Sequence, residues 1–561
     1  MTEELELDDD VRSAAFPILT DAHIAVLARR GVRRTVAQGE VLFKEGDRSY
    51  DFFVLLSGEA EIVERFRGED RVIAAHGAGK FLGEMNMFTG QAVYLTARMR
   101  QAGEVLAVPP ARLKDVITED GTLGESILRA FLLRRSILLG TGAGLKIVGS
   151  RYTPDTLRLR EFAVRNRLPH AWIDSEDDAA AEALLREFEV TPAETPIVIW
   201  HARNILRNPT NAEVAHAIGF GSRVEPAVLS DLVVVGAGPA GLAASVYGAS
   251  EGLSTVAIES VALGGQASTS SRIENYLGFP AGLSGSELAS RALIQADKFG
   301  ARFPEPREAL GLEERNGYYV VSLADGSEIV GRSVIIATGA RYRRLAVPNL
   351  ERYEGTSVYY AATEIESQVC EGSDVAVVGG GNSAGQAALF LARRARKVTI
   401  LIRGDDLNKG MSRYLVDRVV RAENIDVLTH TEIRELGGGD ALESATLEDT
   451  RTGERRLLPL SSVFVFVGAE ANTGWLRGTL ALDERGFVLA GPELKAVGSR
   501  DDGRWLDLDR DPFLLETSLP GVFAAGDARA GSVKRVASAV GEGSMAVRFV
   551  HEYLALRGVS A

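Results

Sequence analysis

Two short glycine-rich segments contain the residue types that a bound pyrophosphate requires, and each lies between a β-branched run and an alanine-rich run. The first contains Gly236, Gly238, Pro239, Ala240 and Gly241. The second contains Gly379, Gly381, Asn382, Ser383 and Ala384. In a strand–turn–helix unit the first glycine permits the tight turn, the second lets backbone N–H groups reach the phosphates, and the third position lets the helix pack on the strand. Two such segments predict two dinucleotide sites, most simply for FAD and for a nicotinamide cofactor that reduces it.

The residue that ends the second strand of each unit indicates which dinucleotide binds there. We expect a strand over 255–258 followed by Glu259, whose carboxylate can accept hydrogen bonds from ribose hydroxyls and disfavours a 2′-phosphate, so the first site suits FAD. The strand expected over 397–402 is followed instead by Arg403, a cation that can pair with the 2′-phosphate of NADP, with Arg413 as a second candidate. The acidic residues after Arg403 keep NADH open as the alternative to the favoured NADPH.

The composition limits the classes of protein to consider. A chain of 561 residues exceeds one hydrophobic core, and its length predicts roughly three or four domains. A formal net charge of −14 disfavours nucleic acid as a partner. The acidic stretch 3–10 does not resemble a signal peptide and no apolar run is long enough to span a membrane, so we expect a cytoplasmic protein without membrane attachment. The single cysteine, Cys370, excludes an intrachain disulfide.

Further motifs follow one another from about residue 230 to the C-terminus in the order found in low-molecular-weight thioredoxin reductases, which this part of the chain resembles. Besides the two turns they include Gly264-Gly265-Gln266, the run 274–280, the strand 334–338 with its turn at Gly339, and the run 522–527. The resemblance implies that Gly265, Gln266 and Asn275 lie along FAD and that Asp527 hydrogen-bonds its ribityl chain. It also places Lys534 and Arg535 beside the flavin ring, where a cation favours the anionic reduced flavin.

The same resemblance implies how the cofactor domains are connected. Segments 227–343 and 471–561 form the FAD-binding domain, and 344–470 is an inserted NAD(P)-binding domain from which the chain returns at Gly468. A homodimer is the expected assembly.

One departure from the family affects the mechanism. Thioredoxin reductases of this type carry a Cys-x-x-Cys pair that the flavin reduces and that then reduces thioredoxin, whereas here Ala361 and Glu364 align with those cysteines. Cys370 is offset from them, and we expect it to pack rather than to react. Tyr359 and Tyr360 either cover the flavin ring or belong to the core. The cofactor sites are therefore expected to be intact while the usual route for electrons is missing.

Residues 1–143 differ in pattern, since short alternating strands separated by glycines predict an antiparallel roll, followed by a helix over 113–139. The region resembles cyclic-nucleotide-binding domains. In that family a Glu after a Gly accepts the ribose hydroxyl, which matches Glu84, and an Arg nine residues later holds the phosphate. Here Val93 occupies the arginine position and Arg98 is out of register, which puts a cyclic nucleotide effector in doubt. Docking, dimerisation and another small ligand are the alternatives.

Residues 144–226 alternate strands and helices and resemble a thioredoxin- or glutaredoxin-like domain. The Thr195-Pro196 step is one that is often cis in these folds. Where the two cysteines of the redox pair would stand, the chain has Ser150 and Thr153. Asp155 then belongs to the first turn of the following helix rather than acting as an acid. We therefore expect a spacer or docking domain without a dithiol.

The predicted fold class is multidomain α/β: an antiparallel β-roll with helices, a small thioredoxin-like domain, and two Rossmann-like three-layer domains. The predicted function is an FAD-dependent NAD(P)H oxidoreductase that passes electrons to an external protein or small molecule. Hydride transfer through flavin needs positioning more than proton relays, so we assign no catalytic acid or base and no metal ligand. The alternatives are a ferredoxin- or flavodoxin-type NADP reductase and a non-catalytic ligand- or redox-sensing flavoprotein.

Overall fold

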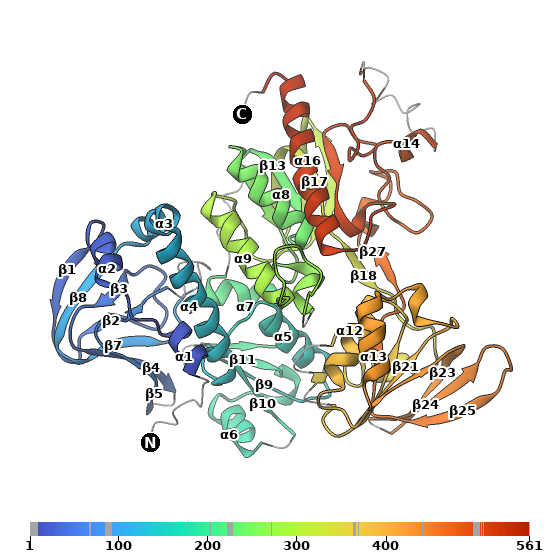
Figure 1. Cartoon of the computed structure of the whole chain (residues 1–561), viewed down its shortest axis with the longest axis horizontal. Helices are drawn as coiled ribbons and strands as arrows, with labels where there is room; N and C mark the ends of the chain where they lie inside the picture. The colour runs from blue at the N-terminus through green and yellow to red at the C-terminus, as the bar shows by residue number, and fades with distance from the viewer. Residues whose placement is uncertain are drawn as a thin grey trace. The chain divides into compact units, whose positions relative to one another are not determined.

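The computed structural model describes residues 9–66, 69–84, 92–176, 178–200, 204–220, 228–270, 272–362, 366–367, 370–439, 441–496, 505, 508 and 510–559. The chain forms two compact units, one of Met1–Val224 with Phe303–Pro306 and the other of Glu225–Arg302 with Arg307–Ala561 (Figure 1). In these described ranges no helix has the length and apolarity needed to cross a bilayer.

The first unit begins with an antiparallel roll of two four-stranded sheets. One sheet has the order β1(Val32–Val36), β8(Gly103–Val108), β3(Phe52–Leu55) and β6(Phe81–Leu82). The other has the order β2(Val41–Phe43), β7(Thr96–Gln101), β4(Glu59–Phe66) and β5(Glu69–His76). All of their pairings are antiparallel, as the glycine-separated strands predict. The helices are α1(Asp9–Ala15), α2(Asp21–Ala28), α3(Pro110–Glu119) and α4(Gly121–Gly140).

The single helix predicted over 113–139 is wrong, because the chain breaks between α3 and α4. Asp120 has extended backbone angles, φ −115° and ψ 95°, and its carboxylate accepts hydrogen bonds from the backbone N–H groups of Thr122 and Leu123. These bonds cap the N-terminus of α4, so Asp120 begins a second helix instead of continuing the first.

The rest of the first unit is a four-stranded sheet with helices. Its elements in chain order are β9(Leu145–Gly149), α5(Pro154–Arg165), β10(His170–Asp174), α6(Ala179–Glu187), β11(Ile197–Trp200), β12(Asn204–Arg207) and α7(Asn211–Ile218). The spatial order is β10-β9-β11-β12, with β10 parallel and β11 antiparallel to β9. The alternating strands and helices predicted for this segment are present, and the Thr195–Pro196 bond is cis.

The hydroxyl residues at the expected dithiol positions shape the turn before α5. Ser150 Oγ accepts a hydrogen bond from the Tyr152 N–H, and Thr153 Oγ1 donates to the Ser150 carbonyl. Asp155 lies in the first turn of α5 and pairs with Arg158 at 3.0 Å, as its assignment to that turn predicts. Neither Ser150 nor Thr153 can form a disulfide. Their hydroxyls therefore serve the structure of the turn.

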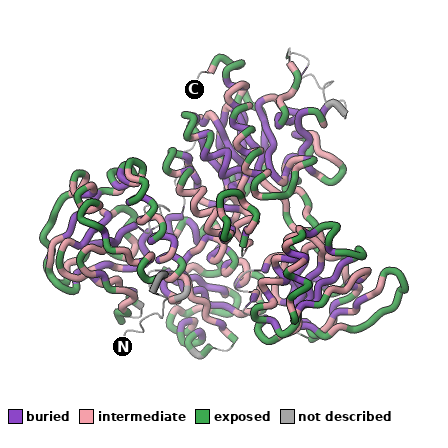
Figure 2. The backbone as a smooth tube through the Cα atoms, in the orientation of Figure 1, coloured by how far each residue is buried: buried purple, intermediate pink, exposed green. Residues whose placement is uncertain are grey.

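The second unit contains a six-stranded sheet whose parallel core is apolar on both faces. Its order is β14(Thr255–Ile258), β13(Ser230–Val235), β17(Glu328–Ile336), β16(Tyr318–Leu323) and β15(Ala309–Arg315), with β28(Val522–Ala524) parallel to β17. The helices α8(Pro239–Ser250), α9(Gly285–Lys298) and α16(Val536–Leu556) accompany it. Figure 2 shows the parallel strands of this sheet mostly buried, as a parallel sheet between helices requires, whereas the antiparallel edge strand β15 is largely exposed.

A second parallel sheet follows in the same unit. Its order is β19(Val358–Tyr359), β26(Ser462–Val465), β20(Asp374–Val378), β21(Lys397–Leu401) and β22(Ile425–Leu428). One apolar cluster packs it against α12(Asn382–Leu391) and α13(Arg413–Arg421). Another packs it against the sheet of β23(Thr431–Gly438), β24(Leu442–Asp449) and β25(Arg455–Pro459). The short ribbon of β18(Ala340–Tyr342) and β27(Ala469–Ala471) carries the chain to this sheet and back. The two Rossmann-like sheets confirm the predicted fold class.

Candidate functional site

The first glycine-rich turn connects β13 to α8, and its three glycines have different physical roles. Gly236 has φ +104°, and a Cβ there would overlap the Ala337 carbonyl. A Cβ on Gly241 would overlap the Gly236 carbonyl. A Cβ on Gly238 would instead have only the Gly265 Cα near it, at 3.9 Å. Gly236 and Gly241 are therefore required by the fold, whereas Gly238 leaves space in front of the N-terminus of α8.

That space suits a phosphate. Gly238 is the N-cap residue of α8 and supplies no side chain, so the first N–H groups of the helix are left for a ligand. Pro239 occupies the first turn, where its missing N–H costs nothing. Gly265 begins a short 3₁₀ turn, Gly265–Thr269, and lies so close that its Cβ would come 2.8 Å from the Gly238 Cα. The structure thus brings Gly238 and Gly265 together, as the resemblance implies.

Glu259 follows β14 and is held against the turn. One carboxylate oxygen accepts a hydrogen bond from the Ala237 N–H at 2.9 Å, and the other accepts from the N–H groups of Ser260 and Val261. Oε2 accepts only the Ala237 N–H, so its second lone pair remains available to a ribose hydroxyl, whereas the bonds to Oε1 orient the group.

Two polar groups nearby lack the solvation that they would have in water. The Thr338 hydroxyl is buried and has no hydrogen-bond partner among the residues that the structure describes. Burial raises the pKa of Asp527, with Glu542 adding to the shift and Lys534 opposing it. Gly339 has φ +67° and open space around its Cα. A ligand rich in hydroxyl and phosphate groups would satisfy such positions, so these residues fit FAD.

The remaining residues expected along FAD are exposed. Gln266 and Asn275 lie on the surface of the second unit. Lys534 donates a hydrogen bond to the Asp527 carbonyl at 3.2 Å and lies over the Phe487 ring. Arg535 precedes α16, is exposed, and forms no ion pair with a residue that the structure describes. Its guanidinium is therefore available to a ligand.

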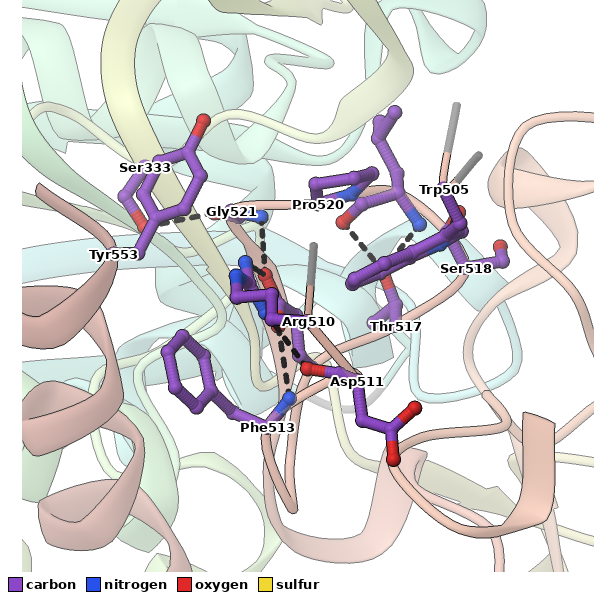
Figure 3. A network of polar contacts seen from close by, with 12 residues as sticks. Ser333, Trp505, Arg510, Asp511, Phe513, Thr517, Ser518, Pro520, Gly521 and Tyr553 are labelled. Atoms are coloured by element: carbon purple, nitrogen blue, oxygen red, sulfur yellow. Dashed lines mark hydrogen bonds and ion pairs between the residues drawn. The ribbon is translucent and has the colours of Figure 1, made fainter. Parts of the chain in front are cut away.

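A buried carboxylate fixes the segment that leads to Asp527. Figure 3 shows this network, in which Arg510 forms a bidentate pair, at 2.6 and 2.8 Å, with the fully buried Glu516. The Glu516 carboxylate also accepts from the N–H groups of Phe513 and Gly521. β28 begins at the residue after Gly521, so the network positions the strand that delivers Asp527. The sequence motifs gave no signal for it.

The second turn connects β20 to α12 with the same geometry. Gly379 has φ +136°, and a Cβ there would overlap the Phe466 carbonyl. Gly381 is the N-cap of α12, and the nearest atom to its Cβ would be 4.0 Å away. Asn382 Oδ1 accepts from the Ser412 N–H at 2.7 Å. Ala384 is fully buried at the third position of the motif.

The closest helix packing in the second turn occurs one residue after Ala384, a detail that the motif did not reveal. A Cβ on Gly385 would lie 2.7 Å from the Met411 sulfur, although the side chain of Met411 is flexible.

Arg403 follows β21, and its side chain is 78% exposed, with Nε 3.9 Å from Glu432. Arg413 begins α13 and pairs with Asp417 at 2.9 Å. The acidic residues after Arg403 are engaged locally, because Asp405 pairs with Lys409, and Asp406 caps the following 3₁₀ turn by accepting from the Asn408 N–H. The guanidinium of Arg403 is exposed and its ion pair with Glu432 is long, so it is accessible to a 2′-phosphate.

Tyr342, at the end of β18, connects the two turns and was not singled out from the sequence. Burial raises its pKa, while a hydrogen bond from the Ser383 hydroxyl opposes the shift and the charge of Asp527 adds to it. Ser383 lies in the first turn of α12 and Asp527 follows β28. Tyr342 therefore shares a hydrogen bond with Ser383 and lies within range of the charge of Asp527.

A second set of contacts joins the loop that carries Asn275 to α12 and α13. Arg418 of α13 donates to both oxygens of Glu274, at 3.0 and 2.9 Å. Gln386 of α12 donates to the Arg272 carbonyl at 3.3 Å. Gly468, with φ +103° and no neighbour within 4 Å of its Cβ, accepts the Arg343 N–H through its carbonyl.

The stretch expected to align with the Cys-x-x-Cys pair follows β19, an edge strand of the second parallel sheet. Ala361 is partly buried, and Glu364 lies outside the described residues. Tyr359 packs against the Phe464 ring at 5.3 Å, and Tyr360 donates a hydrogen bond to Glu354 at 2.7 Å. Both tyrosines are thus engaged by the core of this sheet and the residues beside it, which favours the core assignment over a flavin cover.

Cys370 is fully buried, and burial raises its pKa to about 11. At neutral pH its sulfur is therefore a thiol rather than a nucleophilic thiolate. The expectation that Cys370 packs rather than reacts is consistent with this environment.

In the first unit, Glu84 and Val93 line the same cavity. Glu84 accepts a hydrogen bond from Arg134 of α4 at 2.7 Å, and Val93 is buried. Arg98 pairs with Glu61 and Asp70 on the neighbouring strands, each at 2.7 Å. Arg98 is therefore engaged away from the position where a phosphate would need it.

Comparison with known proteins agrees with both parts of this description. Residues 230–543 match the family model described as pyridine nucleotide-disulphide oxidoreductase, and residues 33–120 match the model described as cyclic nucleotide-binding domain. Over 332 residues, 58% of this chain, the sequence is 32% identical to the thioredoxin reductase of Listeria innocua and covers 93% of it. It is 30% identical, over the same length, to the 34.2 kDa protein in the rubredoxin operon of Clostridium pasteurianum, of which it covers 97%.

Solved structures give the same result. The thioredoxin reductase of Lactococcus lactis in its FR conformation is similar with a TM-score of 0.52 and 27% identity, over 58% of this chain and 99% of that one. The thioredoxin reductase of T. acidophilum is similar with a TM-score of 0.51 and 29% identity, over 58% of this chain and 98% of that one.

Proposed function

The chain belongs to the pyridine nucleotide-disulphide oxidoreductase family, and we propose that it transfers electrons from NADPH through FAD to an acceptor outside the chain. The observation that carries the proposal is the position of Tyr342. It shares a hydrogen bond with Ser383, at the helix N-terminus of the second turn, and its pKa is raised in part by the charge of Asp527, the residue expected at the ribityl chain. This proximity supports one site at which the two dinucleotides meet.

The flavin, when bound, supplies the chemistry of accepting a hydride from a nicotinamide and releasing electrons singly or in pairs. The protein residues bind and orient. The N-termini of α8 and α12 offer unpaired N–H groups to pyrophosphates. Arg403, with Arg413 nearby, offers a cation to a 2′-phosphate, which favours NADPH over NADH.

An external acceptor follows from the thiol chemistry of the chain. Cys370 is the only cysteine of the sequence, and it is buried as a thiol with a raised pKa. Ser150 and Thr153 cannot exchange disulfides. Electrons therefore leave the flavin directly, to a partner disulfide, to a one-electron carrier such as ferredoxin or flavodoxin, or to a quinone or oxygen.

The test is an anaerobic titration of the flavin-loaded protein with NADPH and, separately, NADH, while the flavin absorbance is followed. We expect fast bleaching by NADPH and slower bleaching by NADH. An Arg403→Gln variant should lose the preference for NADPH, whereas Arg396→Gln, which removes an exposed arginine paired with Asp374, should keep it. The absence of bleaching by either cofactor would refute the reductase and favour a flavin-bearing sensor.

The acceptor is then found by reoxidation. The NADPH-reduced protein is mixed anaerobically with thioredoxin disulfide, ferredoxin, flavodoxin or a quinone, and the return of the flavin band is timed. We also propose the cytoplasmic homodimer and the division into an FAD-binding domain with an inserted NAD(P)-binding domain, since both accompany the resemblance. Sedimentation of the purified protein tests the dimer.

A further inference from the structure

The roll of the first unit and helix α4 line a partly open cavity of about 110 Å³. Its walls are mostly apolar and include Phe43, Tyr50, Leu82, Val93 and Tyr94. An engineered apolar cavity of about 150 Å³ holds one benzene molecule, so this volume suits a ligand with a single ring. A nucleoside cyclic phosphate, with a bicyclic base, a sugar and a phosphate, is much larger.

Three polar side chains line the same cavity, and each has a buried atom without a partner among the described residues. They are His76, Glu84 and Arg134, whose residues are 3%, 1% and 9% exposed. The atoms are His76 Nδ1, Glu84 Oε2 and Arg134 Nη2. Buried polar atoms are nearly always hydrogen-bonded, so three at one cavity indicate a missing partner.

Hydrogen bonds to the other polar atoms of Arg134 fix the orientation of the Arg134–Glu84 pair. Arg134 donates through Nε to the Ala15 carbonyl at 2.7 Å, and through Nη1 to the Phe81 carbonyl at 2.9 Å and to Glu84 Oε1 at 2.7 Å. The guanidinium also lies 4.5 Å from the centre of the Phe81 ring. What remains is Nη2 of Arg134, with its two N–H donors, and one acceptor oxygen, Oε2, on Glu84.

The charges of the site select the class of ligand. Arg134 and Glu84 neutralise each other. Burial, with the nearby charges of Arg134 and Lys80, holds the pKa of His76 well below its usual value, so its imidazole is neutral. A charged ligand would lose its hydration in an apolar cavity without gaining a counter-charge. A cyclic phosphate would find Val93 where its arginine should stand.

We propose that this cavity binds an uncharged, single-ring molecule that presents a hydrogen-bond acceptor beside a donor, as a primary carboxamide does. Its carbonyl accepts from Arg134 Nη2 and its N–H donates to Glu84 Oε2, while its ring packs among the apolar walls. Such a ligand satisfies two of the unpartnered atoms without introducing a charge. The proposal does not depend on the redox function of the second unit.

The experiment uses three planar molecules of nearly equal shape and different charge. Benzamide is neutral, benzoate is an anion and benzamidine is a cation. Each is titrated calorimetrically into the full-length protein, alongside cyclic AMP. We expect benzamide to bind at least about tenfold more tightly than either ion, and cyclic AMP not to bind.

Neighbouring alanines on β5 provide a matched pair of variants. Ala74 lines the cavity, whereas Ala75 is exposed. Ala74→Phe fills the cavity with a ring and should abolish benzamide binding, while Ala75→Phe should leave it unchanged. Glu84→Gln leaves Arg134 without its counter-charge and should shift the preference toward benzoate.

Four results would overturn the proposal. They are no benzamide binding at millimolar concentration, equal binding of the three probes, tighter binding of cyclic AMP than of benzamide, and benzamide binding that survives Ala74→Phe. Thermal unfolding of both alanine variants, measured without ligand, separates a filled cavity from a disrupted roll.

Discussion

Replacing Gly238 by alanine should weaken FAD binding without weakening the fold. Gly238 has φ −71° and ψ −173°, which alanine adopts readily, and the nearest protein atom to its Cβ would be 3.9 Å away. At compatible positions Gly→Ala changes stabilise proteins by about 0.4–1 kcal/mol, because the unfolded chain loses freedom. The flavin-free variant should therefore unfold at the same or a slightly higher urea concentration than the parent.

The cost to FAD follows from what the methyl group displaces. It occupies the space in front of the first N–H groups of α8, where a pyrophosphate would approach. Loss of one hydrogen bond to a charged group costs about 1.5–3 kcal/mol, which corresponds to a dissociation constant raised by roughly tenfold to 150-fold. Flavin fluorescence quenching on titration of the flavin-free protein measures this constant directly.

Two controls make the result specific. Gly241→Ala would overlap the Gly236 carbonyl, so it should lower the stability of the flavin-free protein as well as its affinity for FAD. Gly474→Ala meets no atom within 4 Å in the same unit and should change neither. If Gly238→Ala binds FAD as tightly as the parent, the pyrophosphate does not lie at this turn and the site is misplaced.

Three further predictions test other parts of the second unit. Tyr342→Phe removes the hydrogen bond with Ser383, and a neutral hydrogen bond contributes about 0.5–1.5 kcal/mol. The NADPH concentration for half-maximal flavin reduction, measured by stopped flow, should therefore rise by about two- to tenfold. An unchanged concentration would contradict the role of Tyr342. Arg510→Met leaves Glu516 buried and unpaired and should lower the free energy of unfolding by about 3–5 kcal/mol in urea, and a loss below about 1 kcal/mol would show that the pair is dispensable. Cys370 should resist iodoacetamide at pH 7 in the folded protein and react faster as the pH rises toward its raised pKa of about 11, because only the thiolate attacks. Rapid labelling at pH 7 would refute its burial.

The parts of the site that could be predicted from the sequence are those whose chemistry is local in the chain. The turn at Gly236 and the carboxylate at Glu259 each follow a short apolar strand directly, so the motif and its structural context lie within about 30 residues. The break at Asp120 is also local, because Asp is a preferred N-cap residue, so the single helix predicted over 113–139 ignores a start signal present in the sequence.

The parts that could not be predicted depend on contacts between distant segments. Arg134 and Glu84 are 50 residues apart in the sequence, and no pattern in either segment predicts their ion pair. The same is true of Tyr342 and Asp527, which are brought together only when β18 and β28 take their places. Long-range pairing of this kind is decided by packing of whole elements, on which local residue types carry little information.

Cofactor binding and electron delivery are physically separate in this chain. In the proposed function, FAD binding depends on the open backbone at Gly238, on the desolvated carboxylate of Asp527 and on the unpartnered hydroxyl of Thr338. The burial of the last two groups costs stability until a ligand satisfies them. Delivery through a thiol pair, which the resemblance to thioredoxin reductases implies, is not expected here, because Ala361 and Glu364 are the residues expected at the cysteine positions. A ligand that supplies the missing hydrogen bonds stabilises the folded state by mass action, whether or not an acceptor is present. FAD should therefore raise the unfolding temperature even of a protein that no acceptor oxidises, so that stabilisation by flavin reports on the site and only reoxidation reports on the function.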